Sequence, residues 1–253
     1  MKVLIAPDKF KGSLTSVEVI EAISSGLLQE LPTAEVISQP LADGGEGTLD
    51  VLEASLNLER VSVEVQGPLF ISSAAYYLTD GEKAFIEMAV ASGLQLVPLA
   101  KRNPLKTSTY GTGELIRHAL LQGLNEVNLF VGGSATNDCG LGMAKALGYA
   151  FFDKQGNALA GTGADLIKIH IMEKNSALPE LKEARFNILT DVQNPLLGPT
   201  GCAQYYAAQK GASQEVIEQL ERGAMHLATL LSNGFENEKG AGAAGGLGFG
   251  ALS

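Results

Sequence analysis

The chain has 253 residues, 45% of them hydrophobic, and carries a formal net charge of −10 at pH 7. This composition predicts a packed core rather than a disordered chain, and the length allows one large domain or two ordinary ones. The acidic charge argues against nucleic-acid or anionic-membrane partners. No apolar stretch approaches the ~20 residues that span a bilayer. The two cysteines, Cys139 and Cys202, lack a metal or redox spacing, so we expect a reducing cytoplasm.

The first segment is typical of a strand–helix–strand unit. Residues 2–6 form a short apolar run that Pro7 ends, and residues 34–38 form a second run. Between them, residues 15–18 fit a capping box that starts a helix, and Pro32 stops it. We expect that helix to bury Val17, Ile20, Ile23, Leu27 and Leu31. The two strands should be parallel with a right-handed crossover.

The next segment changes character. A glycine loop and a short helix carrying Leu49 and Leu52 precede a strand at 61–65. Residues 72–78 and 84–88 then predict a β-hairpin around Asp80-Gly81, a strong turn signal. Because strand–helix alternation gives way here to antiparallel strands, we place a domain boundary near Gly67. Residues 1–66 would form a first α/β domain, and residues 67–253 a second with a mixed sheet.

Alternation returns in the second half of the chain. The pattern predicts, in order, a helix at 111–122, a strand at 126–131, a helix at 138–147, a strand at 185–190 and a helix at 213–231. The chain then ends on the glycine-rich stretch "GAGAAGGLGFGALS". The fold class is therefore α/β.

Several loops after predicted strands are rich in glycine and small polar residues. They are "APDKFKGSLTS", "LADGGEGT", "LFVGGSATND" and "LTDVQNPLLG", and a similar loop, "TSTYGTGE", opens a helix. Ligands of open α/β sheets bind at the carboxyl ends of strands, where glycine loops and helix N-termini favour anions. One such loop is more often ordinary turn chemistry. Several together favour an anion site, and we expect the strand ends to converge on one cleft.

The charged residues of these loops have two interpretations. Lys9 and Lys11 could neutralise a phosphate or carboxylate, although a lysine pair is more often a solvated surface feature. The loop acids are Asp8, Asp43, Glu46, Asp138 and Asp191. Magnesium prefers one or two carboxylates plus phosphate oxygens and water, whereas Asp138 fits a helix cap equally well.

Standard nucleotide-binding and hydrolase motifs are missing from the sequence. There is no Gly-Lys dipeptide for a Walker A loop and no G-x-S-x-G elbow. A G-x-G-x-x-G match at 240–245 does not follow a predicted strand, and the three histidines are scattered. These observations argue against a P-loop protein, a Rossmann dinucleotide-binding protein and an α/β-hydrolase.

The loops together resemble the bacterial glycerate kinases that share no fold with protein kinases or P-loop enzymes. The resemblance rests on "APDKFKGSLTSVEV", "ADGGEGTLDVL", "GPL", "IEMAVASGL", "NPLKTSTYGTGELI", "VGGSATNDCGLGMAKALG", "DVQNPLLGPTGCA", "QKGA" and "GAGAAGGLG". It implies two α/β domains, one with a flavodoxin-like parallel sheet, and an active site in the cleft. It also implies ATP and Mg²⁺ as cofactors and D-glycerate as substrate. The product would be 2-phosphoglycerate, with 3-phosphoglycerate and a homodimer left open.

The resemblance suggests a role for each loop. Lys9 and Lys11 would meet phosphate or the glycerate carboxylate, Asp43 and Glu46 would hold magnesium directly or through water, and Asp191 would orient the glycerate hydroxyl. Other binding residues would be Asp8, Ser13, Gly44, Gly45, Thr109, Gly111, Thr112, Gly132, Gly133, Ser134, Thr136, Asn137, Asp138 and Asn194.

Members of that family are longer and continue past the last glycine run. We therefore expect a further segment to complete the first domain, and we expect "GLGFGALS" to have no obvious place to pack without it. Residues 1–253 alone would then be less stable and lack activity. The alternative function is a non-catalytic module that binds glycerate or another small anion.

Overall fold

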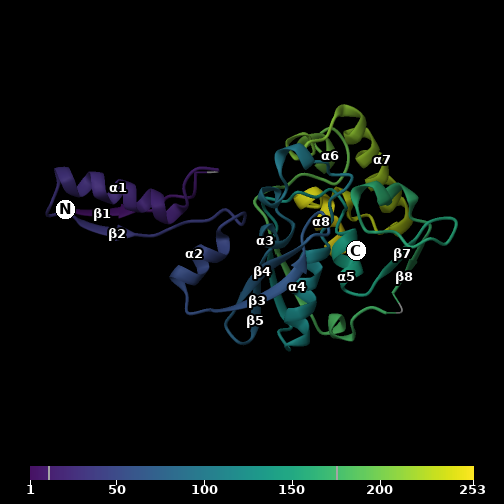
Figure 1. Ribbon diagram of the computed structural model, residues 1–253, viewed down its shortest axis with the longest axis horizontal. Helices are drawn as coiled ribbons and strands as arrows, with labels where there is room; N and C mark the ends of the chain where they lie inside the picture. Colours follow the sequence, from purple (N-terminus) through teal and green to yellow (C-terminus); the bar gives the residue numbers. More distant parts are fainter. Residues whose placement is uncertain (11, 175) are drawn as a thin grey trace.

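The computed structural model of the protein describes residues 1–10, 12–174 and 176–253. Lys11, predicted to bind phosphate, lies outside the described residues. The predicted strand–helix–strand unit is confirmed: β1 (Lys2–Ile5) and β2 (Glu35–Ser38) pair in parallel, and α1 (Ser16–Glu30) connects them. Figure 1 shows this unit standing apart from the rest of the chain, with α2 (Thr48–Ser55) between the two parts.

The predicted capping box begins α1. Thr15 Oγ1 accepts from the Glu18 amide at 3.2 Å, and a Glu18 carboxylate oxygen accepts from the Thr15 amide at 2.7 Å. The prediction of which α1 side chains are buried is wrong in part. Ile20 is buried, but Val17, Ile23 and Leu31 are 42 to 46% exposed. Since β1 and β2 have four residues each, they cover only a narrow strip of the helix.

The main sheet has five strands in the order β3-β4-β5-β6-β9. They are β3 (Glu59–Gln66), β4 (Ser72–Thr79), β5 (Lys83–Glu87), β6 (Glu126–Phe130) and β9 (Arg185–Leu189). The first three are antiparallel, which confirms the predicted hairpin, and the last three are parallel. The sheet therefore begins with β3, before Gly67. A domain boundary near that residue stays a prediction.

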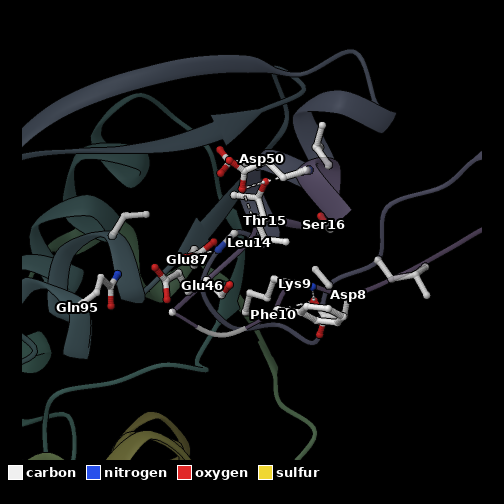
Figure 2. Close-up of a pocket in the computed structure, with 18 of the residues that line it drawn as sticks. Asp8, Lys9, Phe10, Leu14, Thr15, Ser16, Glu46, Asp50, Glu87 and Gln95 are labelled. Carbon is white, nitrogen blue, oxygen red and sulfur yellow. Dashed lines mark hydrogen bonds and ion pairs between the residues drawn. The ribbon is translucent and has the colours of Figure 1, made fainter. Parts of the chain in front are cut away.

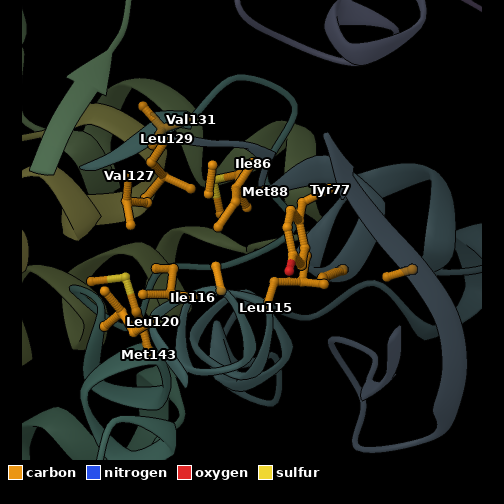
Figure 3. Close-up of a cluster of buried hydrophobic side chains, with 14 of the residues drawn as sticks. Tyr77, Ile86, Met88, Leu115, Ile116, Leu120, Val127, Leu129, Val131 and Met143 are labelled. Carbon is orange, nitrogen blue, oxygen red and sulfur yellow. The ribbon is translucent and has the colours of Figure 1, made fainter. Parts of the chain in front are cut away.

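One face of this sheet carries the main core. Helix α4 (Tyr110–Leu121) packs there with α3 (Ala89–Ser92) and α5 (Leu141–Ala146). Figure 3 shows the buried side chains facing one another between sheet and helices. They include Tyr77, Ile86, Met88, Leu115, Ile116, Leu120, Val127, Leu129, Val131 and Met143. The mixed α/β class is confirmed.

A second buried cluster lies beyond α5. It involves α6 (Cys202–Tyr206), α7 (Gln214–Leu231), α8 (Ala243–Leu252) and β7 (Ala150–Phe152). Strand β7 pairs with the exposed strand β8 (Ile171–Glu173). Short 3₁₀ helices connect these elements: η1 (Leu94–Leu96), η2 (Leu99–Lys101), η3 (Gly163–Lys168), η4 (Pro179–Lys182), η5 (Ala208–Lys210) and η6 (Phe235–Asn237). No helix in the described part of the chain is long and apolar enough to cross a membrane.

The expectation that the last glycine-rich stretch has no place to pack is wrong. Leu247 and Phe249 of α8 are fully buried, one in each cluster. A Cβ on Gly248 would lie 2.1 Å from the Gly240 carbonyl oxygen, and one on Gly250 would lie 2.1 Å from that of Cys139. The glycines therefore let α8 lie directly against two other backbone segments.

Candidate active site

Four strand ends meet at one cavity, as predicted. The cavity has a volume of about 580 Å³ and is lined by Lys9 after β1, Asp43 after β2, Ser134 after β6 and Asp191 after β9. Glu46, Gly45, Gly132 and Gly133 also line it. The predicted convergence of these loops is confirmed, while the chemical roles of their residues stay predictions.

Lys9 and Asp43 form the central ion pair of the cavity wall. Lys9 Nζ lies 2.9 Å from Asp43 Oδ1 and 3.7 Å from Asp8 Oδ1, and the lysine side chain is 12% exposed. Burial alone would lower the pKa of Lys9, but the hydrogen bond to Asp43 and the charges of Asp43, Asp8 and Glu87 raise it. The ammonium at the cavity therefore stays charged, because the Asp43 carboxylate balances its charge even when no ligand is bound.

Two glycine loops touch beside this pair. The Gly132 amide donates to the Gly44 carbonyl oxygen at 3.1 Å. A Cβ on Gly132 would lie 2.5 Å from Gly45 Cα, closer than any side chain can approach. Gly44 and Gly133 have φ values of 84° and 72°, which favour glycine. The glycines thus bring the loops after β2 and β6 into direct contact.

Gly132→Ala should push these loops apart. We expect a loss of about 1–3 kcal/mol of stability from overpacking and about a hundredfold loss of activity from displaced groups. Gly26→Ala is the matched control: it lies in α1 with nothing within 4 Å of its Cβ, and there alanine should stabilise by about 0.5–1 kcal/mol. Urea unfolding and turnover of both variants check this. An unchanged Gly132→Ala protein would contradict the contact.

A second cavity of about 520 Å³ adjoins the first and shares Lys9 and Glu46 with it. Figure 2 shows its residues, among them Asp8, Glu46, Glu87 and Gln95. Ser13, predicted to bind ligand, is exposed at this second cavity rather than at the first. The predicted site therefore extends over two neighbouring hollows.

Glu87, at the end of β5, is a site residue that the sequence did not reveal. It is 1% exposed, and its carboxylate accepts from the Gly47 amide at 3.2 Å and the Leu49 amide at 3.1 Å, at the start of α2. Burial raises the pKa of Glu87 to about 7, although these amides oppose the shift. Its only signal in the sequence was its place in the motif "IEMAVASGL", which was assigned no chemical role.

Stability should therefore depend on the protonation of Glu87. Its pKa is about 7 in the folded protein and 4.5 in the unfolded chain. The stabilising contribution is complete below pH 4.5 and is lost as the pH rises through 7, by about 3 kcal/mol. The glutamine of Glu87→Gln does not titrate in this range. The free energy of unfolding of the wild type should therefore fall, relative to that of the variant, between pH 5 and pH 8. Urea unfolding at both pH values measures it, and parallel pH profiles would contradict it.

Other predicted binding residues tie the scaffold together and do not line either cavity. Asp138 is fully buried and accepts from Thr109 N and Oγ1, both at 2.8 Å, and from the Gly140 and Gly142 amides. The predicted helix start at Asp138 is wrong, because Gly140 takes φ = 75° and α5 begins at Leu141. Burial raises the pKa of Asp138, and hydrogen bonds oppose the shift.

The remaining predicted binding residues also line neither cavity. Thr112 Oγ1 lies 2.8 Å from Ser92 Oγ, and Gly111 packs against the Gln66 carbonyl group. Thr136 and Asn137 are also buried, but Thr136 Oγ1 and Asn137 Oδ1 have no hydrogen-bond partner among the described residues. Asn194 accepts from the Tyr206 hydroxyl at 2.8 Å and donates to the Thr200 carbonyl at 2.7 Å. These residues shape the loops, whereas Lys9, Asp43, Glu46, Ser134 and Asp191 face the cavity.

Two further cations at the first cavity were missed, Arg102 and Lys210. Lys210 is buried and donates to Ser134 Oγ at 2.8 Å and to the Thr136 carbonyl oxygen at 2.7 Å. Its only signal in the sequence was the "QKGA" motif, which carried no chemistry of its own.

The chain is similar to known proteins over its whole length. The sequence profile described as "Glycerate kinase family" matches residues 3–253. "Glycerate kinase" of Haemophilus influenzae is 42% identical over all of this chain, which covers 68% of that relative. "Glycerate 2-kinase" of Escherichia coli is 41% identical over 98% of this chain and 67% of its own length.

A solved structure is similar over the whole chain. It is the crystal structure of putative glycerate kinase 2 from Salmonella typhimurium LT2, which is 44% identical. The TM-score is 0.82, and the match covers 100% of this chain and 69% of that one. The chain belongs to the glycerate kinase family.

Proposed function

We propose that this protein transfers the γ-phosphoryl group of ATP to the 2-hydroxyl of D-glycerate, giving ADP and 2-phosphoglycerate. Membership of the glycerate kinase family and relatives named glycerate kinase support glycerate phosphorylation. The Escherichia coli relative named "Glycerate 2-kinase" supports the 2-position. The observation that carries the proposal is a single cavity lined by Lys9, Asp43, Ser134 and Asp191.

Phosphoryl transfer depends on positioning and charge neutralisation. The Lys9 ammonium would bind a phosphoryl oxygen while its bond to Asp43 fixes its place. Asp43 and Glu46 offer carboxylate oxygens at the same cavity, the ligands that Mg²⁺ prefers together with phosphate oxygens. A bound Mg²⁺ would neutralise phosphate charge. The described residues contain no group of three or more acidic, His or Cys side chains that could hold a metal, so phosphate oxygens would complete its ligands.

Asp191 would position the acceptor. Its carboxylate accepts the proton of the glycerate 2-hydroxyl while that oxygen bonds to the γ-phosphorus. The bond from the γ-phosphorus to the β–γ bridging oxygen breaks, and ADP leaves with that electron pair. Ser134, on the neighbouring strand-end loop, would donate a hydrogen bond to the substrate.

Turnover of the protein tests this function directly, while the inactivity expected of residues 1–253 alone stays a separate prediction. We expect ADP release that requires D-glycerate and Mg²⁺, measured by a coupled assay, and a ³¹P NMR signal of 2-phosphoglycerate rather than 3-phosphoglycerate. Binding of D-glycerate without turnover would support the non-catalytic anion-binding module instead.

We also propose a cytoplasmic location. Cys139 and Cys202 are both free thiols buried in the fold, as is usual for proteins of reducing compartments. A homodimer stays a prediction.

A further inference from the structure

Lys210 is an unusual component of the first cavity. Its side chain comes from η5, between α6 and α7, and the residue is 3% exposed. Its Nζ donates to Ser134 Oγ at 2.8 Å and to the Thr136 carbonyl oxygen at 2.7 Å. Both acceptors are neutral, so they satisfy two of the three N–H donors of the ammonium without balancing its charge.

No carboxylate forms an ion pair with Lys210 among the residues that the structure describes. The nearby charge of Asp138 acts on it, but that carboxylate is already bonded to Thr109 and to two amides. Burial lowers the pKa of Lys210 to about 8. A buried, unbalanced ammonium disfavours folding, and groups perturbed in this way gather at functional sites.

The fold holds a second cation beside Lys210. Gly211 follows it with φ = 90°, and a Cβ there would lie 2.4 Å from the Arg102 carbonyl oxygen. Because Gly211 has no side chain, the end of η5 can lie in direct contact with the backbone of Arg102. Arg102 uses Nε to bond the Val97 carbonyl oxygen at 3.3 Å, and both cationic residues line the cavity. Lys9 is instead paired with Asp43.

We propose that Lys210 and Arg102 form an anion-binding subsite, in which the Lys210 ammonium binds an oxyanion of a substrate. The ligand chemistry is a carboxylate or phosphoryl oxygen, supplied by the hydroxy acid or by the nucleotide. This inference rests on the proposed function and adds two residues to its site. The competing explanation is that Lys210 only ties the loop of Ser134 to η5.

Two variants of Lys210 distinguish the effect of its charge on ligand binding from the effect of its hydrogen bonds to the loop of Ser134. Lys210→Met removes the donor and the charge, whereas Lys210→Gln keeps an N–H donor without the charge. Lys145→Met is the matched control, because Lys145 also donates to a carbonyl oxygen, that of Leu159 at 2.5 Å, but does not line the cavity. Calorimetry would measure the affinity of each protein for D-glycerate, the ATP analogue AMP-PNP with Mg²⁺, and inorganic phosphate.

We expect both Lys210 variants to bind one of the organic ligands about tenfold to a hundredfold more weakly, as for loss of a charge-assisted contact, while Lys145→Met binds normally. Weaker D-glycerate binding identifies the carboxylate, and weaker AMP-PNP binding identifies the phosphoryl group. Arg102→Gln should weaken the same ligand.

Three results would overturn the subsite. They are unchanged affinities in both Lys210 variants, normal binding by Lys210→Gln with weak binding by Lys210→Met, and a wild type that binds none of the three probes. A wild type whose anion binding depends on Lys210 but which shows no turnover would contradict the proposed function and leave the subsite standing.

Discussion

Replacing Asp191 by asparagine is expected to lower kcat for ATP-dependent phosphorylation of D-glycerate by about 10²–10⁴-fold, the usual contribution of a general base. Asparagine keeps the size of the side chain but cannot accept the hydroxyl proton. Asp191 is exposed at the end of β9, so the stability should change by no more than about 0.5 kcal/mol. Steady-state kinetics and thermal melting measure the two effects separately.

The design has a control and a clear contrary outcome. Glu183→Gln removes another exposed carboxylate, outside both cavities, and should leave kcat unchanged. A kcat for Asp191→Asn within threefold of the wild type would show that another group accepts the proton. A kcat restored by higher Mg²⁺ would instead assign Asp191 to the metal, with Asp43 and Glu46.

Much of the fold follows from local signals. The capping box at Thr15 and the Asp80-Gly81 turn depend on neighbouring residues, so both could be predicted. The rule that parallel strands of one sheet end at one edge explains why the loops after β1 and β2 lie together, and why those after β6 and β9 do. It does not explain why the ends of these two separate sheets meet. The exposed face of α1 could not be predicted, because periodicity shows which face is apolar and not whether another element covers it.

The site was predictable in outline only. Glycine and small polar residues occur both in loops that bind ligands and in buried hydrogen-bond networks that hold the scaffold together. The sequence therefore could not separate Ser134, which faces the cavity, from Asp138, which holds α4 to α5. Lys210 was missed because its partners lie more than seventy positions earlier in the chain. Glu87 was missed because its amide partners precede it by 38 and 40 positions.

The packing of the glycine-rich helix α8 could not be predicted from the sequence either. A stretch with many glycines is typical of loops and linkers, and this one was expected to lack a place in the core. Gly248 and Gly250 instead allow backbone contacts at distances no other residue permits. Phe249, between them, fills the cluster built by Leu166, Leu196 and the helix α7.

Phe249→Ala should accordingly be the most destabilising single substitution considered for this chain. Phe249 is fully buried, and its amide donates to the Ala241 carbonyl oxygen at 2.9 Å. Truncation removes the buried ring and leaves a cavity that close backbone contacts on both sides prevent from collapsing, so we expect a loss of about 3–5 kcal/mol.

Leu252→Ala is the control in the same helix: Leu252 is 47% exposed, and its loss should cost about 0.5 kcal/mol or less. Urea unfolding followed by circular dichroism compares the two. Because Cys139 and Gly140 pack against α8 and lead into α5, the Phe249 variant should also loosen the loop of Ser134 and lose turnover. A loss below 1 kcal/mol would mean that α8 contributes little to the core.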